Sequence, residues 1–220
     1  MYLPDECWEC IFKIYLGHGG DHRYLQPLSV LSKQFLTVTD SFQLSLIVSN
    51  QTLPFLPRLL QRFTNLTTID LKRFTGDRDA LLTQISRFPL PVRTLNLSNH
   101  PTIPANGLGA FSQRITTLTS LVCSNIVYIR KSDLFLIANC FPLLEELDLS
   151  LPKYIDFYSL PKYMDFYDDF EINALSLALP RLRKVNLSRS YYINDVSLYH
   201  IIFAKTARFL KKLLYLTANT

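Results

Sequence analysis

The residues able to carry acid–base or metal chemistry are few and widely spaced in this chain. Its four histidines lie outside any local metal-ligand or catalytic motif: His18, His22, His100 and His200. Asp156 and Asp165 look like paired carboxylates, but their separation reflects only a duplicated nonapeptide. A Ser/His/Asp set, a phosphate-binding loop and a zinc pattern are all missing from the sequence. We therefore expect a non-catalytic protein with no catalytic residue, no metal site and no cofactor.

The cysteines predict buried or helix-surface thiols. Cys7 and Cys10 form a lone C-x-x-C pair, and a zinc site would need a second pair of ligands. We expect both to lie on the face of a helix. Cys123 stands where leucine recurs in neighbouring segments, which predicts a core position. Because the sequence shows no secretory signal, its four cysteines do not indicate a disulfide framework.

The net charge of +5 and the pI near 9.0 raise the question of a nucleic-acid partner. The basic residues are scattered or recur at regular spacing, and no aromatic–basic motif of a nucleic-acid module is present. We therefore expect a solvated basic face and no nucleic-acid partner. No apolar run reaches the roughly 18 residues of a membrane span, and the acidic segment 1–6 is not a signal peptide. These features predict a protein of the cytoplasm, the nucleus or both, with no membrane partner.

A leucine motif of fixed spacing predicts the elements that must position any binding residues. Its pattern is L-x-x-L-x-L with conservative replacements. The regular copies are Leu66/Ile69/Leu71, Val92/Leu95/Leu97, Leu118/Leu121/Cys123 and Leu144/Leu147/Leu149. The phase returns at Leu182/Val185/Leu187 and, more weakly, at Leu210/Leu213/Tyr215. The period of about 26 residues falls in the range of roughly 20–29 that is typical of leucine-rich repeats. We expect an α/β solenoid of parallel strands and short helices.

Each repeat is expected to run from a strand through a loop to a short helix. Helices are predicted at 79–86, 132–140 and 194–202, with Ser132 and Asn194 as the N-cap residues of the last two. The segment 42–50 (FQLSLIVSN) is expected to form a degenerate extra strand that joins the N-terminal residues to the array.

The period is broken once, between Leu144 and Leu182. These two residues are separated by more than the regular spacing between one copy of the motif and the next. The segment 150–158 is copied at once as 159–167, with one change from Ile155 to Met164. Two interpretations stay open. The insertion is either an aromatic loop at one rim of the solenoid that contacts a partner, or a duplication that a loop tolerates at small entropic cost.

The residues between the leucines are expected to line the concave face of the sheet. This face runs from neutral to acidic to basic along the array. The candidates for contact with a protein client are Arg93, Asn96, Glu145, Glu146, Asp148, Arg183 and Lys184. The acidic residues of this set are Glu145, Glu146 and Asp148, and they stand beside the basic Arg183 and Lys184. This arrangement is either an element of specificity or a pair of ladders that neutralise each other across strands.

Residues 1–40 follow a different pattern. Pro4 suits the first turn of a helix. The acidic residues after it complement the positive end of that helix: Asp5, Glu6 and Glu9. A loop at 17–21 ends it. A second helix is predicted by four apolar residues at near-helical spacing: Leu25, Leu28, Leu31 and Phe35. Taken alone, these helices would suit an amphipathic cap on the first repeat.

Residues 2–40 also resemble an F-box, most closely its plant members. The likeness is carried by Leu3-Pro4-Asp5-Glu6, by Ile11-Phe12 and by Leu28-Ser29-Val30-Leu31-Ser32-Lys33-Gln34-Phe35. With leucine-rich repeats after it, the chain is similar to the F-box/leucine-rich-repeat class over nearly its whole length. The resemblance implies a three-helix F-box at 1–40 and about six to seven repeats at 41–220.

The resemblance further implies a substrate-recognition subunit of an SCF-type cullin-RING ubiquitin ligase, which directs protein ubiquitination and degradation. In such a subunit the F-box docks on the Skp-type adaptor of the cullin ligase core, and the repeats hold a protein client, here unidentified. The residues implied to face the adaptor are Leu3, Pro4, Ile11, Leu28 and Leu31. The alternative is a non-catalytic repeat scaffold or a truncated, inactive receptor fragment, because Thr220 follows the last strand motif without a polar capping repeat.

Overall fold

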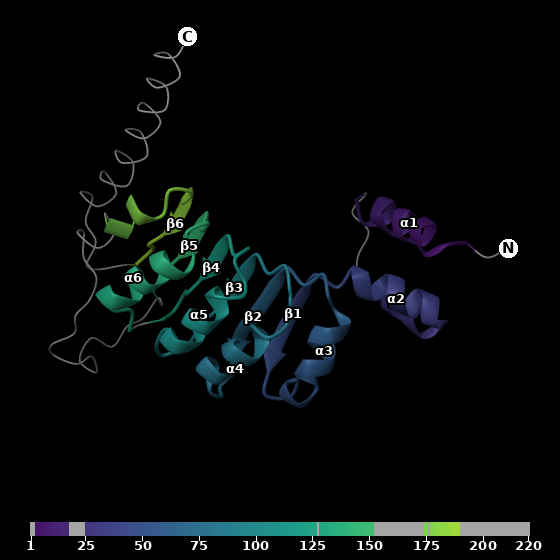
Figure 1. The fold of residues 1–220 in the computed structure, drawn as a ribbon, viewed down its shortest axis with the longest axis horizontal. Helices are drawn as coiled ribbons and strands as arrows, with labels where there is room; N and C mark the ends of the chain where they lie inside the picture. The colour runs from purple at the N-terminus through teal and green to yellow at the C-terminus, as the bar shows by residue number, and fades with distance from the viewer. Residues whose placement is uncertain (1–2, 18–24, 127, 152–173, 176, 190–220) are drawn as a thin grey trace, which may run out of the picture.

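The protein is an α/β structure built on one parallel sheet. The computed structural model describes residues 3–17, 25–126, 128–151, 174–175 and 177–189. Six strands in this part pair in chain order: β1 (Ser45–Ser49), β2 (Thr68–Arg73), β3 (Thr94–Asn96), β4 (Ser120–Val122), β5 (Glu146–Asp148) and β6 (Lys184–Asn186). Figure 1 shows them as a continuous row that ends at the green β6. The predicted strands are confirmed at these positions, including the extra strand within 42–50, whereas the weaker motif at Leu210/Leu213/Tyr215 lies outside the described residues.

The register of the sheet repeats the spacing of the sequence. Thr68 pairs with Thr94, Thr94 with Ser120, and Ser120 with Glu146, so each partner lies one period further along the chain. Glu146 then pairs with Lys184, across the segment where the period is broken. The longer connection therefore leaves the register unchanged. Residues 152–167 of the duplicated segment lie outside the described residues.

A repeated backbone contact sets this register where each strand begins. The Thr67 carbonyl accepts hydrogen bonds from the N–H groups of Arg93 and Thr94, at 2.7 and 2.9 Å. The same arrangement joins the Arg93 carbonyl to 119 and 120, the Thr119 carbonyl to 145 and 146, and the Glu145 carbonyl to 183 and 184. The start of each new strand is thus hydrogen-bonded to the strand before it through backbone groups alone.

The motif leucines fill the core, as predicted. Strand centres contribute Ile69, Leu95 and Leu121, all fully buried, and Leu147 at 2% exposure. Side chains alternate across a strand, so every second residue must face away from this core. Cys123 is also fully buried, and burial raises the pKa of its thiol far above the ordinary value. It therefore acts as a small apolar residue.

In the described part of the chain, the helices that follow the strands lie on one side of the sheet (Figure 1). They are α3 (Leu56–Arg62), α4 (Arg78–Ile85), α5 (Ala105–Ser112) and α6 (Lys131–Cys140). Asp77 caps α4 by accepting the Ala80 N–H at 3.0 Å. The prediction that Ser132 is the N-cap residue of the helix 132–140 is wrong, because α6 begins at Lys131 and its N-cap residue is Arg130. There the Asp133 carboxylate accepts the Arg130 N–H at 2.8 Å. The predicted helix 194–202, with Asn194, lies outside the described residues.

The N-terminal residues form α1 (Asp5–Gly17), the 3-10 helix η2 (Gln26–Val30) and α2 (Lys33–Ser41). A single second helix across Leu25–Phe35 was expected, and this prediction is wrong. Ser32 is fully extended, and its hydroxyl accepts the Phe35 N–H at 3.1 Å, which starts α2 afresh. Cys7 and Cys10 lie on α1 as exposed free thiols, as predicted.

These helices enclose a hydrophobic cluster of their own, which we call the helical module. Its centre is Phe12, at 5% exposure, with Leu25 and Val38. The Trp8 and Phe35 rings lie 4.8 Å apart, a favourable tilted aromatic contact. This cluster is separate from the core under the sheet.

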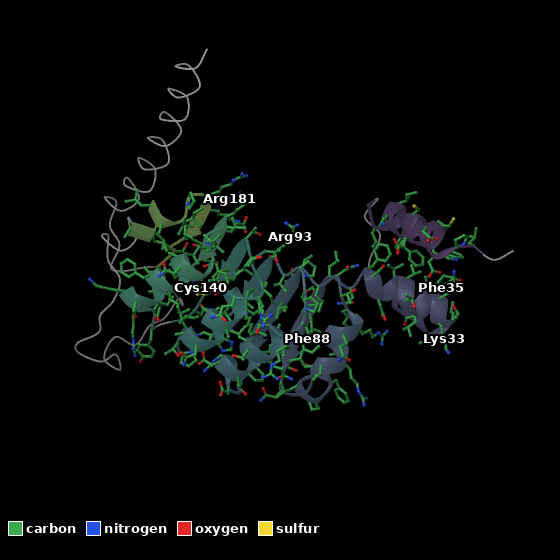
Figure 2. All side chains as sticks on the ribbon, in the orientation of Figure 1. Lys33, Phe35, Phe88, Arg93, Cys140 and Arg181 are labelled. Atoms are coloured by element: carbon green, nitrogen blue, oxygen red, sulfur yellow. The ribbon has the colours of Figure 1, made fainter. Side chains whose placement is uncertain are left out.

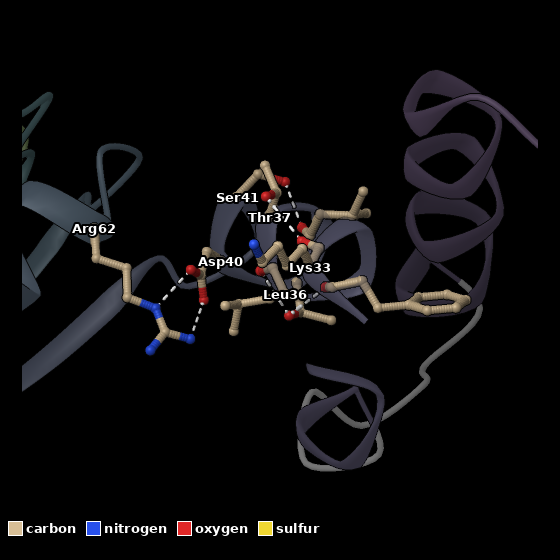
Figure 3. A network of polar contacts seen from close by, with 9 residues as sticks. Lys33, Leu36, Thr37, Asp40, Ser41 and Arg62 are labelled. Carbon is tan, nitrogen blue, oxygen red and sulfur yellow. Dashed lines mark hydrogen bonds and ion pairs between the residues drawn. The ribbon is translucent and has the colours of Figure 1, made fainter. Parts of the chain in front are cut away.

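The helical module is joined to the sheet by a bidentate ion pair. Arg62 of α3 donates from Nε and Nη2 to the two Asp40 oxygens of α2, at 2.6 and 2.7 Å (Figure 3). This contact raises the pKa of the Arg62 guanidinium above its ordinary value. Asn65 adds a hydrogen bond from its side chain to the Ser41 carbonyl at 3.0 Å. Two-point contacts of this kind fix orientation as well as distance.

The close approach of α4 and α5 gives a test of the packing. A Cβ on Gly107 would lie 2.7 Å from the Asp79 Cα, whereas one on Gly109 would meet nothing within 4 Å. We expect Gly107→Ala to lower the free energy of unfolding by about 1–3 kcal/mol, because the helices must move apart. Gly109→Ala, in the same helix, should raise it by about 0.5–1 kcal/mol. Urea unfolding measures both, and equal effects of the two substitutions would contradict this packing.

Candidate functional site

The side of the sheet opposite α3, α4, α5 and α6 carries two rows of side chains, which we call the open face. The register places the first row at Ser45, Thr68, Thr94, Ser120, Glu146 and Lys184. The second row is Ile47, Asp70, Asn96, Val122, Asp148 and Asn186. None of these twelve is fully buried. The open face therefore presents side chains that the core does not require.

Two predicted client residues, Asn96 and Asp148, also serve the turns that follow their strands. The Asn96 side-chain oxygen accepts the Ser98 N–H, and Asp148 accepts the Ser150 N–H, both at 2.9 Å. Such side-chain turns satisfy backbone groups where the ladder ends. The second Asp148 oxygen accepts a hydrogen bond from the Asn186 amide at 3.1 Å. Part of the hydrogen-bonding capacity of this row is thus already used within the protein.

The acidic and basic residues meet at Glu146 and Lys184, which are cross-strand neighbours. Their charged atoms lie 3.9 Å apart, and the side chains are 52% and 73% exposed. Ser120 also donates its hydroxyl to Glu146 at 3.4 Å. An ion pair this long and this exposed contributes little to stability. One cross-strand ion pair therefore joins the acidic and basic residues, and it leaves both charges accessible to a partner.

Three other predicted client residues, Arg93, Glu145 and Arg183, sit just before their strands. Their backbones belong to the anchoring ladder. The two arginine side chains are exposed, and that of Glu145 is half-buried. Figure 2 shows Arg93 at the rim of the sheet, pointing away from the helices. Within the described ranges, neither guanidinium has a hydrogen-bond or ion-pair partner. Positive charge therefore flanks the acidic residues of β5 on both sides.

The helical module carries a second exposed surface, and it is apolar. Four of the five predicted adaptor-facing residues are exposed: Leu3 at 37%, Pro4, Ile11 at 44% and Leu31 at 66%. Leu28 differs, because it packs against the cluster around Phe12. Ile14 at 62% and Val30 at 84% are also exposed. Neither residue was among the predicted adaptor-facing residues, because spacing alone does not show which apolar side chains stay outside the cluster around Phe12.

His100, which lies outside any motif of the sequence, is a structural histidine. It is 4% exposed and lies between α4 and the end of β2. Arg78 can only donate, so its contact with Nδ1 at 3.0 Å requires Nδ1 to accept. Nε2 therefore carries the proton and donates to the Leu71 carbonyl at 2.8 Å. Burial, followed by the charge of Arg78, lowers the pKa of His100 below its ordinary value.

No protein-family model matches this chain. Within the described residues, no helix has the length and apolar character needed to cross a membrane. The same part of the chain holds no group of three or more His, Cys, Asp or Glu side chains arranged to bind a metal ion.

The buried His100 predicts a pH-dependent stability with a definite sign. Because the folded pKa is lowered, the unfolded chain binds more protons below about pH 6.5. The contribution of His100 is complete above that pH and is lost as the pH falls. We expect the unfolding free energy to drop between about pH 7.5 and pH 5.5, and His100→Gln to flatten this slope. The variant keeps the other three histidines, so equal slopes in urea titrations of both proteins would contradict the assignment.

Proposed function

We propose that this protein is the substrate-recognition subunit of an SCF-type ubiquitin ligase. In this proposal the helical module is an F-box that docks on a Skp-type adaptor, and the open face holds a protein client. The observation that carries it is a helical module with its own core and an exposed apolar surface, joined by a bidentate ion pair to a sheet with one open face.

The separate cluster around Phe12 favours a docking module over a cap. A cap would bury its apolar residues against the first repeat and extend that core. Here the module packs around its own aromatic residues and meets the sheet through polar contacts, chiefly Asp40 with Arg62. The alternative of a plain repeat scaffold leaves the exposed apolar surface without a role.

The apolar surface has the character of a partner site. Ile11, Ile14 and Tyr15 stand at helical spacing on one side of α1, where residues three and four apart are neighbours. Leu31 and Val30 expose still more apolar area beside α2. Exposed apolar patches on a protein surface often mark sites of interaction with a partner.

The sheet supports the leucine-rich-repeat part of the proposal. Parallel strands lie about 4.8 Å apart, whereas packed helices need about 8–10 Å. Stacking strand–helix units therefore bends the array with its strands on the inside. The open face would then be the concave surface that repeat proteins use to bind partners.

The proposed mechanism is proximity, with no reacting group on this chain. One end binds the ligase and the other holds the client, so the client's lysines meet a ubiquitin-charged enzyme at high effective concentration. That advantage depends on geometry, and a loose joint would dilute it. The two-point contact between Asp40 and Arg62 holds the joint.

Adaptor capture tests this proposal. We expect purified Skp-type adaptor to bind the folded chain, and the double variant Ile11→Ala/Leu31→Ala to lower affinity about tenfold or more, as for residues central to an interface. Both side chains are already exposed, so folding should be unaffected. Phe55→Ala is the matched control, because Phe55 is 58% exposed but lies outside the helical module.

Failure of the folded wild-type chain to bind the adaptor would remove the ligase role. Equal weakening by Phe55→Ala would show that the contact is unspecific apolar adhesion.

A further inference from the structure

Two positions in the second row of the open face depart from the rule that its other four members obey: Ile47 on β1, at the edge of the described sheet, and Val122 on β4, inside it. In the second row, the side chains on β2, β3, β5 and β6 each accept the N–H two residues further on. The acceptors are Asp70, Asn96, Asp148 and Asn186. The β4 residue is Val122, which offers no acceptor. A position that breaks a local rule without a compensating contact is more often a functional site than a random one.

The departure at Val122 coincides with a hollow in the open face. Its lining side chains are Ser120, Val122, Glu146, Asp148, Lys184 and Asn186. Ser120 lies directly across from Glu146, and Val122 directly across from Asp148. The small serine and the short valine on β4 leave room that the larger β5 and β6 side chains enclose. The hollow is therefore lined by the apolar Val122 side chain on β4, by the carboxylates of Glu146 and Asp148 on β5, and by Lys184 on β6.

We propose that this hollow is the specificity pocket for a basic side chain of an extended client segment. The proposal rests on the proposed function only in that the open face receives a protein client. Lysine and arginine bury their apolar stems while keeping the charged head in polar surroundings. In this pocket the stem lies over Val122, and the head reaches the carboxylates of Glu146 and Asp148.

The surrounding charges define the rest of the segment. Lys184 holds Glu146 only at 3.9 Å, in an exposed pair that an incoming cation displaces at small loss. An acidic side chain would instead lose its hydration and be repelled by the two carboxylates, so the pocket disfavours it. Arg93 on one side and Arg183 on the other favour acidic residues flanking the basic one. Three strand spacings of about 4.8 Å separate β3 from β6, a span of about four extended residues.

The repeat itself supplies the decisive variant, Val122→Asn. Asparagine already occupies this row at Asn96 and Asn186, with its side chain bonded to the following turn. The substitution should therefore keep or raise the urea midpoint of unfolding, while it replaces the apolar Val122 side chain by a polar one. Glu146→Gln removes the nearest charge and keeps the side-chain size. Lys72→Gln is the control, because Lys72 is exposed on β2 outside the hollow.

The probe is a phage-displayed dodecapeptide library selected on the immobilised, folded full chain. We expect enriched peptides to carry a lysine or arginine flanked by acidic residues. Val122→Asn and Glu146→Gln should each weaken a selected peptide by about two- to fivefold, the range for exposed charge contacts. Lys72→Gln should leave its affinity unchanged.

Selection of acidic or purely apolar peptides, or undiminished binding by Val122→Asn, would overturn the pocket. The adaptor takes no part in this experiment. If the chain binds the adaptor but selects no basic peptides, the pocket proposal alone is overturned. If it selects basic peptides whose binding depends on Val122, the pocket is supported even where the chain fails to bind the adaptor.

Discussion

The structure depends on one backbone contact repeated along the sheet, in which a single carbonyl accepts the N–H groups of the first residue of the next strand and of the residue before it. The contact at Thr67 recurs at Arg93, Thr119 and Glu145. Because it fixes where each strand starts, it also fixes which residues point into the core and which line the open face. A shift of one residue would bury the charges of Glu146 and Lys184 and expose the leucines, so the register tolerates no slippage.

A sheet held by its backbone and its leucines leaves its other side available for binding. The open-face ion pair is long and exposed, and the turn-forming residues Asn96 and Asp148 use only part of their hydrogen-bonding capacity. The helical module shows the same division. Its aromatic cluster holds it together, while Ile11 and Leu31 stay exposed. In both halves the residues that stabilise the fold differ from those that offer binding surface.

Much of this could be predicted from the sequence, because periodicity survives in short, regular strands. The regular leucine spacing placed every strand from β2 to β5 and the buried Cys123. Local contacts between distant residues escaped it. The break at Ser32 depends on a hydroxyl that caps α2, Leu28 faces inward because of the cluster around Phe12, and His100 is buried by contacts with Leu71 and Arg78. Spacing alone carries no information about such partners.

The sheet does not need the charges of its open face in order to fold. Native-state hydrogen exchange can measure this by comparing the wild-type chain with the triple variant Arg93→Ser/Glu146→Ser/Lys184→Ser. We expect the strand amides at Thr94 and Ser120 to keep their protection, because their acceptors are backbone carbonyls. Loss of protection across the sheet in the variant would show that the charges hold the fold, and would contradict their assignment to binding.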